Sequence, residues 1–461
     1  MGKGTTRPRQ GIAVSPKDRL EQELMANGIA DVIVTLKASA EAKAEAAAAS
    51  AALGRVSAGR SPVVFKTELP ADLVSCFEST DEAVEHVRGA TAALRTSGTR
   101  GIRKLSGPQV IQVRFLRNLG LVLGSTNSRG VKALEKHPWV KDVVSMPELS
   151  PVSPKRIVPR ELRSRSVEEI AWGIKHLNVP YLWGQGLRGK GIKIGHLDTG
   201  ADGKHPMLED VFEAFAEFDN MGNRVIPNPR PHDTDKCHGT HTAGIIAGRP
   251  ISGYKLGVAP EAKLASAIVI DGGIVTLRVL AGLDWALEQG IRVLNMSLGV
   301  RGKAQEFLGI TERVRERGVL LIAAIGNEGQ NSSRSPGNNP DVLSVGAMNA
   351  EGDVPDFSSS SAFPPPPNRI VPDVVAPGVA VLSAAPQNKY MLIDGTSMAA
   401  PHISGVAALL FQAKPDATPD EVREAIFNSC ELLTPMRHER ANRGVPNAEK
   451  AYRTLTGDPG G

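Results

Sequence analysis

The stretch IKIGHLDTG, residues 192–200, decides the fold class of this 461-residue chain. It begins as a nearly continuous apolar strand and ends in a turn that carries an acid, Asp198. Later segments repeat the apolar pattern: KLASAIVI, RVLNMSL, VLLIAAI and DVLSVGA. Strands that are apolar throughout are typical of parallel sheets covered on both faces. Because helical stretches separate them, we expect an α/β fold, with a doubly wound, mostly parallel sheet and helices on both faces.

Three short runs carry the chemistry, in the order acid, imidazole, hydroxyl. GHLDTG surrounds Asp198, HGTHTAG begins at His238, and GTSMAAPH surrounds Ser397. A hydroxyl becomes a nucleophile when an imidazole takes its proton and a buried carboxylate holds the imidazole in the right tautomer. The order Asp, His, Ser separates this arrangement from the other common serine-hydrolase layouts.

The local context of each run favours a functional interpretation over a structural one. Asp198 follows a buried strand, and functional groups in open α/β sheets gather at the carboxyl ends of strands. Ser397 precedes a run that is apolar nearly all round, so it lies near the amino end of a buried helix, where negative charge is favoured. Taken singly, Asp198 could be a turn residue and Ser397 a helix cap. Together with His238 they indicate a catalytic site.

These motifs make the chain similar to the subtilisin family of serine proteases, from about Trp172 to Tyr452. The resemblance implies a subtilisin-like catalytic domain in which Ser397 is the nucleophile, His238 the general base and Asp198 the residue that orients it. It also implies that Asn327, in the run LLIAAIGNEG, donates its side-chain amide to the oxyanion.

The second histidine of the HGTHTAG run, His241, is then a packed structural neighbour of His238. The spacing of the two histidines also invites a zinc interpretation. That interpretation is weak because the usual zinc-protease pattern needs histidines four residues apart with an adjacent glutamate.

A protein or peptide substrate is expected to bind as an added strand. Glycines that follow buried strands let a peptide backbone approach and pair through its main chain, although each could be an ordinary turn. A pocket near the strand before Asn327 would set the side-chain preference, which the sequence does not predict. The candidate substrate-binding residues are Gly272, Gly273, Ser297, Leu298, Gly299, Ala324 and Gly326.

The N-terminal third reads as a smaller α/β domain. Strand and helix patterns alternate in the order strand, helix, strand, strand, helix, strand, which predicts a ferredoxin-like fold. The strand patterns lie at 31–36, 109–116, 119–124 and 139–146, and the helical ones at 38–53, 81–94 and 128–138. Its last part, RGVKALEKHPWVKDVVSMPELSPV, resembles the end of a subtilase pro-domain, which implies a zymogen with an intramolecular inhibitor. An unrelated accessory domain is the alternative. The predicted divisions are a tail at 1–30, the pro-domain-like region at 31–150, a linker at 151–168, the catalytic domain at 169–455 and a tail at 456–461.

The linker at 151–168 is rich in proline and arginine and is expected to be exposed. A cut near Arg160, Arg163 or Arg165 would release the catalytic domain. A basic linker that is never cut is the alternative.

Composition indicates which partners and which cellular location to expect. The net charge of +5 is spread along the chain and aromatic residues make up only 4%, so nucleic acid is not an expected partner. We see neither a signal-peptide pattern nor a membrane-spanning stretch, so we expect a cytoplasmic protein with no membrane partner, with non-classical export left open. Three widely spaced cysteines do not suggest a disulfide framework and fit a reducing compartment.

No cofactor or metal is expected, although weak calcium sites stay open. Many subtilases bind calcium through an Asn-rich loop after the histidine helix. The corresponding segment, GRPISGYKLGVAP at 248–260, lacks the oxygen-bearing side chains that a hard cation needs.

The sequence thus predicts a serine endopeptidase that works through an acyl-enzyme intermediate. Two alternatives remain. The chain could be a narrow-specificity processing protease that acts on an intracellular partner, or a binding protein on a protease scaffold that has lost catalysis.

Overall fold

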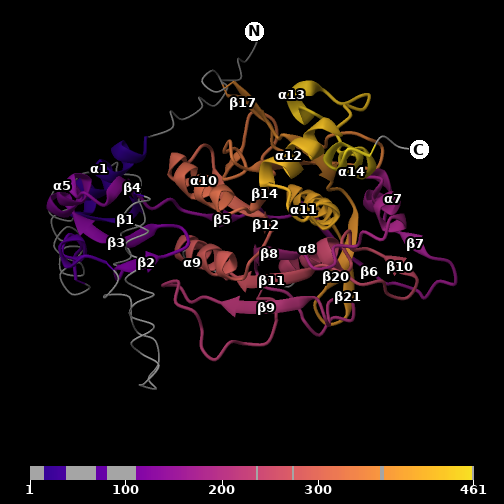
Figure 1. Cartoon of the computed structure of the whole chain (residues 1–461), viewed down its shortest axis with the longest axis horizontal. Coiled ribbons are helices and arrows are strands. Elements are labelled where there is room, and N and C mark those ends of the chain that lie inside the picture. Colours follow the sequence, from indigo (N-terminus) through magenta and orange to yellow (C-terminus); the bar gives the residue numbers. More distant parts are fainter. Residues whose placement is uncertain are drawn as a thin grey trace, which may run out of the picture. The chain divides into compact units, whose positions relative to one another are not determined.

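The computed structural model describes residues 15–37, 69–79, 111–234, 237–271, 275–363 and 368–458. The chain divides into two compact units (Figure 1). The first comprises Met1–Phe115 and Leu121–Met146, and the second comprises Leu116–Gly120 and Pro147–Gly461.

The first unit is built on a four-stranded sheet with the order β2-β3-β1-β4. The central strand β1 is antiparallel to both β3 and β4. Its inward residues, such as Val32 and Val34, join a small apolar core with Leu134 of helix α5. The elements are α1 (Pro16–Asn27), β1 (Ile29–Leu36), α3 (Ala71–Val74), β2 (Arg114–Leu116), β3 (Leu121–Asn127), α5 (Ser128–Lys136) and β4 (Val140–Ser145).

Most of the sequence patterns in this unit correspond to elements of the structure. The stretches at 31–36 and 139–146 form β1 and β4, and SRGVKALEKHP forms α5. The N-terminal tail contains α1, which begins after the Ser15 cap. The helical patterns at 38–53 and 81–94 lie outside the described residues, so the ferredoxin-like order stays a prediction.

The second unit contains a seven-stranded sheet with the order β19-β16-β14-β12-β8-β11-β9, in which neighbouring strands are parallel. This confirms the doubly wound α/β fold. The edge strands β9 and β19 were not predicted, because β9 (FEAFAE) carries two glutamates instead of a continuous apolar run and β19 has only four residues. The strands are β8 (Lys193–Asp198), β9 (Phe212–Glu217), β11 (Lys263–Ile268), β12 (Val293–Met296), β14 (Leu320–Ala324), β16 (Leu343–Met348) and β19 (Val374–Pro377).

Helices cover both faces of this sheet. Figure 1 shows α9 (Val275–Glu288) and α10 (Leu308–Glu316) on one side, and α8 (His238–Ala247) and α11 (Thr396–Ala413) on the other. The remaining helices of the unit are α6 (Trp172–His176), α7 (Val179–Gly184), η1 (Gln305–Phe307), α12 (Pro419–Asn428), α13 (His438–Ala441) and α14 (Ala448–Thr456).

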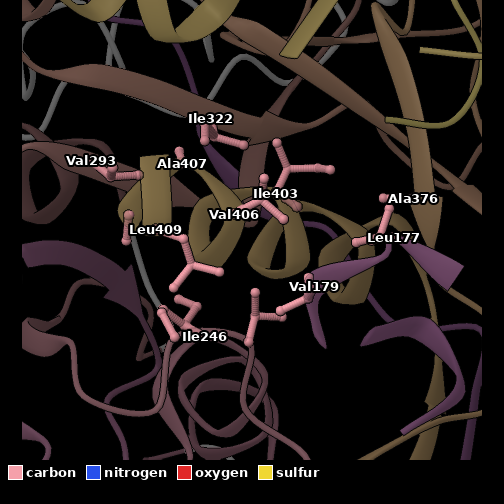
Figure 2. Packing of buried hydrophobic residues seen from close by; sticks show 14 of the residues in the cluster. Leu177, Val179, Ile246, Val293, Ile322, Ala376, Ile403, Val406, Ala407 and Leu409 are labelled. Carbon is pink, nitrogen blue, oxygen red and sulfur yellow. The ribbon is translucent and has the colours of Figure 1, made fainter. Parts of the chain in front are cut away.

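Helix α11 is the centre of the core. Its residues from Thr396 to Phe411 are buried, because one face packs on the sheet and the others on neighbouring helices. Figure 2 shows Ile403, Val406 and Leu409 of this helix packed among side chains from α8 and the strands. Pro401 is the sixth residue of α11 and has no N–H to donate to the carbonyl of Ser397; the Ser297 hydroxyl donates to that carbonyl instead, at 3.1 Å.

Shorter strands pair at the margins of the second unit. Strand β5 (Ser150–Pro151) pairs with β13 (Leu298–Arg301), which also pairs with β15 (Arg334–Ser335). Strand β6 (Arg156–Arg160) pairs with β21 (Lys389–Asp394), which also pairs with β20 (Val381–Ala385). The other pairs are β7 (Glu169–Ile170) with β10 (Tyr254–Lys255), and β17 (Ser361–Phe363) with β18 (Arg369–Val371).

The strand order fixes where the site lies. Strand β8 lies between β11 and β12, and the chain builds the sheet first to one side of β8 and then to the other. Such a switch in direction leaves a crevice at the carboxyl ends of the strands, which is where Asp198 ends β8. Among the described helices, none is both long and apolar enough to cross a membrane.

Candidate active site

The acid and the imidazole meet across the end of β8 and the start of α8. His238 Nδ1 lies 2.6 Å from Asp198 Oδ1. The approach depends on Gly239, because a Cβ there would stand 1.9 Å from the carbonyl oxygen of Gly200. Any larger residue would push the helix away from the turn that carries the acid.

The environment of Asp198 keeps it ionised. Its side chain is fully buried and accepts hydrogen bonds from the Thr199 N–H at 2.8 Å and the Thr242 hydroxyl at 3.2 Å. Burial alone would raise the pKa of this carboxyl, but the charge and hydrogen bond of His238 outweigh burial and lower it. A buried carboxylate of this kind can orient a neighbouring imidazole and stabilise its charged form.

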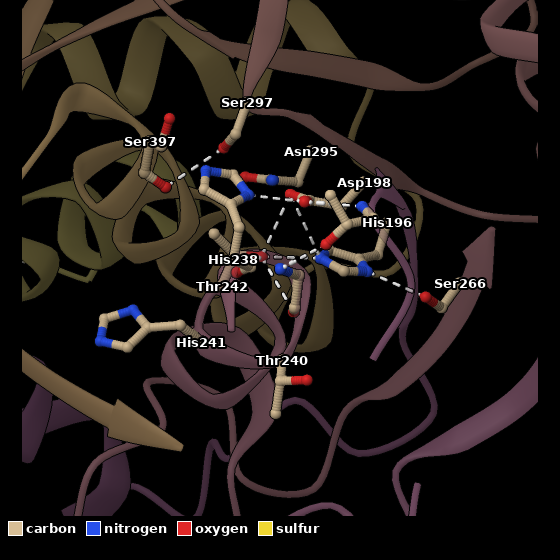
Figure 3. A network of polar contacts seen from close by, with 12 residues as sticks. His196, Asp198, His238, Thr240, His241, Thr242, Ser266, Asn295, Ser297 and Ser397 are labelled. Atoms are coloured by element: carbon tan, nitrogen blue, oxygen red, sulfur yellow. Dashed lines mark hydrogen bonds and ion pairs between the residues drawn. The ribbon is translucent and has the colours of Figure 1, made fainter. Parts of the chain in front are cut away.

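A second buried histidine, His196, stands behind the pair. Its Nε2 is 3.8 Å from Asp198 Oδ2, and its two ring nitrogens contact the hydroxyls of Thr242 at 2.8 Å and Ser266 at 2.9 Å. Burial lowers the pKa of His196, which favours the neutral ring. This residue therefore supports the carboxylate through packing and hydroxyl contacts (Figure 3).

Sequence reasoning missed Asp233, which ties together the segments that carry Asp198 and His238. It accepts hydrogen bonds from the Thr199 hydroxyl at 2.7 Å and from the Thr240 N–H at 2.8 Å. The Thr199 hydroxyl in turn accepts from the Gly239 N–H at 2.9 Å. Burial raises the pKa of Asp233 to about 7, although these hydrogen bonds lower it. The only signal in the sequence was an acid shortly before the histidine run.

Ser397 lies in the first turn of α11. Its hydroxyl donates to the carbonyl oxygen of Val152 at 3.0 Å. The Ser297 hydroxyl donates to the carbonyl of Ser397 at 3.1 Å and so fixes the start of the helix. Figure 3 shows the ring of His238 between Asp198 on one side and Ser397 on the other, so the three predicted side chains are brought together.

Asn327 is oriented by the helix that carries Ser397. Its side-chain oxygen accepts from both the N–H and the hydroxyl of Thr396 at 2.9 Å, which leaves the amide nitrogen pointing outward. That nitrogen donates to the carbonyl of Ser153 at 2.9 Å. Asn327 thus presents a fixed donor to Ser153, the residue that follows the one whose carbonyl the Ser397 hydroxyl contacts.

The chain's own segment 150–154 occupies this site as an extended strand. Strand β5 is antiparallel to β13, with Pro151 opposite Leu298 and Ser150 opposite Gly299. The Val152 N–H donates to the carbonyl of Ser297 at 3.3 Å, which continues the ladder toward Ser397. The Val152 side chain is 0% exposed. Within the predicted linker at 151–168 only Val152 is buried, because its main chain and side chain pack on the body of the unit, whereas Ser153 and most of the later residues are exposed as expected.

Arg334 is a second residue that sequence reasoning missed. Its guanidinium is buried and paired with Glu328, with Nε 3.0 Å from Glu328 Oε1. Its Nη1 donates to the carbonyl oxygens of Gly299 at 3.0 Å and Pro151 at 3.2 Å, and to the Ser150 hydroxyl at 3.0 Å. Burial would raise the pKa of Glu328, but the hydrogen bond and charge of Arg334 lower it.

The remaining substrate-binding candidates lie at the end of β14, on β13, and in a part of the chain that the structure does not describe. Ala324 ends β14 and is fully buried, and Gly326 follows it beside Glu328 and Arg334. At Gly299, a Cβ would stand 2.5 Å from the carbonyl oxygen of Ser335, so the missing side chain makes room for β15 as well as for a peptide. Residues 272–274, with the candidates Gly272 and Gly273, lie outside the described residues.

His241 faces away from this site. Its Nε2 lies 3.0 Å from the carbonyl oxygens of both Val381 and Met391, and burial lowers its pKa to about 3. Within the described ranges, no three His, Cys, Asp or Glu side chains are grouped in a way that could hold a metal ion.

An arginine in the loop after α8 donates hydrogen bonds to main-chain carbonyls at the two ends of that loop. Arg249 Nη1 donates to the carbonyls of Ala247 at 3.1 Å, Pro260 at 2.6 Å and Ala262 at 3.2 Å. Its Nε lies 2.8 Å from Asp210 Oδ1, and this hydrogen bond lowers the pKa of Asp210. The guanidinium of Arg249 is thus a positive charge that the chain itself supplies to this loop.

Comparisons with known proteins agree with this geometry. Residues 189–453 match the model of the subtilase family. The chain belongs to this family.

Its relatives include several subtilisins and a protease named as intracellular. Subtilisin E of Bacillus subtilis (strain 168) is 33% identical over 272 residues, which span 58% of this chain and 67% of that protein. Subtilisin BL of Lederbergia lenta is 34% identical over 288 residues, which span 62% of this chain and 100% of that protein. The Major intracellular serine protease of Bacillus subtilis (strain 168) is 34% identical over 255 residues, which span 53% of this chain and 76% of that protein. This subtilase is therefore a serine-type endopeptidase, and its substrates are proteins or peptides.

Proposed function

We propose that this subtilase cleaves peptide bonds through an acyl-enzyme formed on Ser397. His238 takes the proton of the Ser397 hydroxyl and later passes it to the leaving amine. Asp198 holds the His238 ring through the 2.6 Å contact at Nδ1, which leaves Nε2 for the hydroxyl. The observation that supports this most directly is the convergence of the three side chains at the carboxyl end of β8.

Asn327 is proposed as the oxyanion donor. Thr396 holds its side-chain oxygen, so the amide nitrogen is already oriented before a substrate arrives. A donor that is fixed in advance stabilises developing negative charge without the cost of reorienting during the reaction.

Substrate recognition on the N-terminal side of the cut bond is proposed to use the main chain. The edge of β13 pairs with a peptide strand, and Arg334 binds peptide carbonyls rather than a charged side chain. Such contacts favour extended polypeptides of varied sequence.

We further propose that the chain is made as a zymogen blocked by its own segment 150–154. The Ser397 hydroxyl contacts the carbonyl of Val152, whereas the Asn327 amide contacts the carbonyl of the next residue, Ser153. In a productive complex both groups act on one carbonyl. This offset slows attack on the Val152 carbonyl, so the segment blocks the site as an inhibitor until it is cut, and the region at 31–150 that precedes it supplies the remainder of the inhibitory domain.

Self-cleavage is expected at the Val152–Ser153 bond, because the Ser397 hydroxyl lies 3.0 Å from the carbonyl of that bond. Intact mass spectrometry of the purified full-length protein should show two fragments that end at Val152 and begin at Ser153. The Ser397→Ala protein should stay whole. Fragments that begin after Arg160, Arg163 or Arg165 instead would contradict this assignment, and a cut in the Ser397→Ala protein would point to another protease.

A narrow intracellular role remains the second candidate. Among the residues that the structure describes, Cys76, Cys237 and Cys430 form no disulfide, which suits a reducing compartment. One relative is named an intracellular serine protease. We propose a cytoplasmic location on these grounds. Broad cleavage of unfolded proteins would argue against restriction to one partner.

We propose that the loop after α8 is stable without calcium. The Arg249 guanidinium already binds the carbonyls of Ala247, Pro260 and Ala262 and the carboxylate of Asp210, so a cation of the chain itself holds the two ends of the loop together.

Chelation with EDTA should therefore leave the melting temperature unchanged. Arg249→Ala should lower the free energy of unfolding by about 2–4 kcal/mol, because three carbonyls and one carboxylate would lose a charged donor. Both measurements are best made on the Ser397→Ala protein, which cannot digest itself. Arg188→Ala, which removes an ion pair with Glu261 at 3.8 Å, is the surface control and should cost less than about 1 kcal/mol. A large drop in melting temperature with EDTA would refute calcium independence.

A further inference from the structure

The polypeptide that blocks the site continues past Ser397 along a second strand edge. After Val152 and Ser153 the chain turns into β6, which is antiparallel to β21. The register runs from Arg156 opposite Asp394 to Arg160 opposite Tyr390. The Lys155 N–H also donates to the carbonyl of Asp394 at 2.8 Å. One continuous segment therefore pairs with β13 before the Val152–Ser153 bond and with β21 after it.

Main-chain pairing, rather than side-chain burial, holds β6 in place. Four of its five residues are exposed, and Ile157 is 49% exposed although it is apolar. A strand with so little buried side chain is recognised through its backbone. The edge of β21 can therefore accept a polypeptide of another sequence in the same way.

The far end of this edge has room for side chains. A cavity of about 850 Å³ lies there; the segment itself lines it with Pro159 and Leu162, and the body of the unit lines it with the apolar Pro206, Ile251 and Tyr390 and the polar Ser252, Asn388 and Lys389. Pockets for side chains next to a strand edge are the usual means by which main-chain docking gains selectivity. The cavity begins where Arg160, the eighth residue after the Val152–Ser153 bond, pairs with Tyr390.

We propose that the edge of β21 is a second docking strand, which binds the extended part of a polypeptide substrate on the C-terminal side of the cut bond, and that β6 is its resident occupant. This inference rests on the proposed zymogen. Cleavage of Val152–Ser153 leaves β6 attached to the catalytic unit, because β6 follows that bond. The cut enzyme then accepts short substrates at once, whereas long ones must first displace a tethered competitor.

The test compares two double variants of β6. Ile157→Pro with Val158→Pro removes both consecutive N–H donors, so whichever of them faces β21 is lost. Ile157→Ala with Val158→Ala shortens the same side chains but keeps both donors, and it is the matched control. Each self-processed enzyme is assayed on two substrates. The short one carries residues 150–152 on a chromogenic amide, and the long one copies residues 150–160 with a fluorophore and quencher at its ends.

The two variants should hydrolyse the short substrate at equal rates. On the long substrate, the proline variant should have a kcat/KM about tenfold or more above that of the alanine control, because the tethered competitor is weakened. Equal rates on the long substrate would overturn the proposal. A parallel change on both substrates would also overturn it, because it would mean a general effect on the site.

A binding measurement separates this inference from the proposed function. If neither variant hydrolyses the short substrate, the proposed catalytic role fails, and docking is then measured without catalysis. Both double variants are made in the Ser397→Ala chain and titrated with a fluorescent peptide that copies residues 153–162. The proline variant should bind it about tenfold more tightly than the alanine control. Equal affinities would overturn the docking strand whatever the chemistry.

Discussion

Replacing Ser397 with alanine should lower kcat by about 10⁶, which is the size established for loss of the nucleophile in subtilisin itself. The reason is that the hydroxyl forms the covalent bond, and water bound at the same place cannot replace it. The variant should be cut in trans by a trace of immobilised wild-type enzyme before the assay. This step separates the loss of chemistry from the loss of self-processing.

Ser404→Ala is the matched control for this prediction. Ser404 lies on the same helix, is equally buried, and donates to Asn295 Oδ1 at 2.9 Å rather than to the blocking segment. Its removal should change kcat less than about tenfold. Labelling with a fluorophosphonate should modify the Ser404→Ala protein and leave the Ser397→Ala protein unmodified. A Ser397→Ala enzyme that keeps a substantial part of the normal activity would mean that another nucleophile acts.

Asp198→Asn should lower kcat by about 10⁴ with little change in folding. The amide is nearly the same size as the carboxylate, but it carries no charge to stabilise the imidazolium of His238. It would also favour the wrong tautomer if its nitrogen faced Nδ1, which now lies 2.6 Å from the carboxylate. Steady-state kinetics on the short chromogenic substrate measures the effect.

Asp233→Asn is the variant to compare with Asp198→Asn, because both carboxylates accept hydrogen bonds from Thr199. Asp233 binds Thr199 and Thr240, and so acts on the two segments beside the catalytic pair. Its substitution should therefore lower kcat less than about a hundredfold, through a small displacement of the two segments. If Asp233→Asn and Asp198→Asn had equal effects, the roles of the two carboxylates would have to be reassigned.

The choice of catalytic side chains was accessible from sequence because each has a local signature. Asp198 ends an apolar strand, His238 begins a helix of small residues, and Ser397 begins a buried helix. A parallel sheet brings the ends of such strands to one edge, so their meeting follows from the fold class. The candidate role of Asn327, which follows β14, came instead from the resemblance to the subtilisin family.

The supporting residues could not be found in this way. Asp233 acts through contacts with Thr199 and Thr240, and Arg334 acts through the carbonyls of a strand far earlier in the chain. Neither residue lies in a periodic pattern. An acid in a loop and an arginine before a Ser-Pro pair are more often exposed, so nothing in their surroundings predicted burial.

The sequence by itself determined the parallel α/β sheet and supplied the candidate acid, imidazole, hydroxyl and amide of the proposed site, because periodicity and short motifs act over a few residues. Only the tertiary structure decided that residues 150–160 run through the site along β13 and β21, and that Arg249 occupies the loop after α8. Pairing between strand edges is made by backbone groups that every residue carries, so no local pattern specifies which distant segment a free edge accepts.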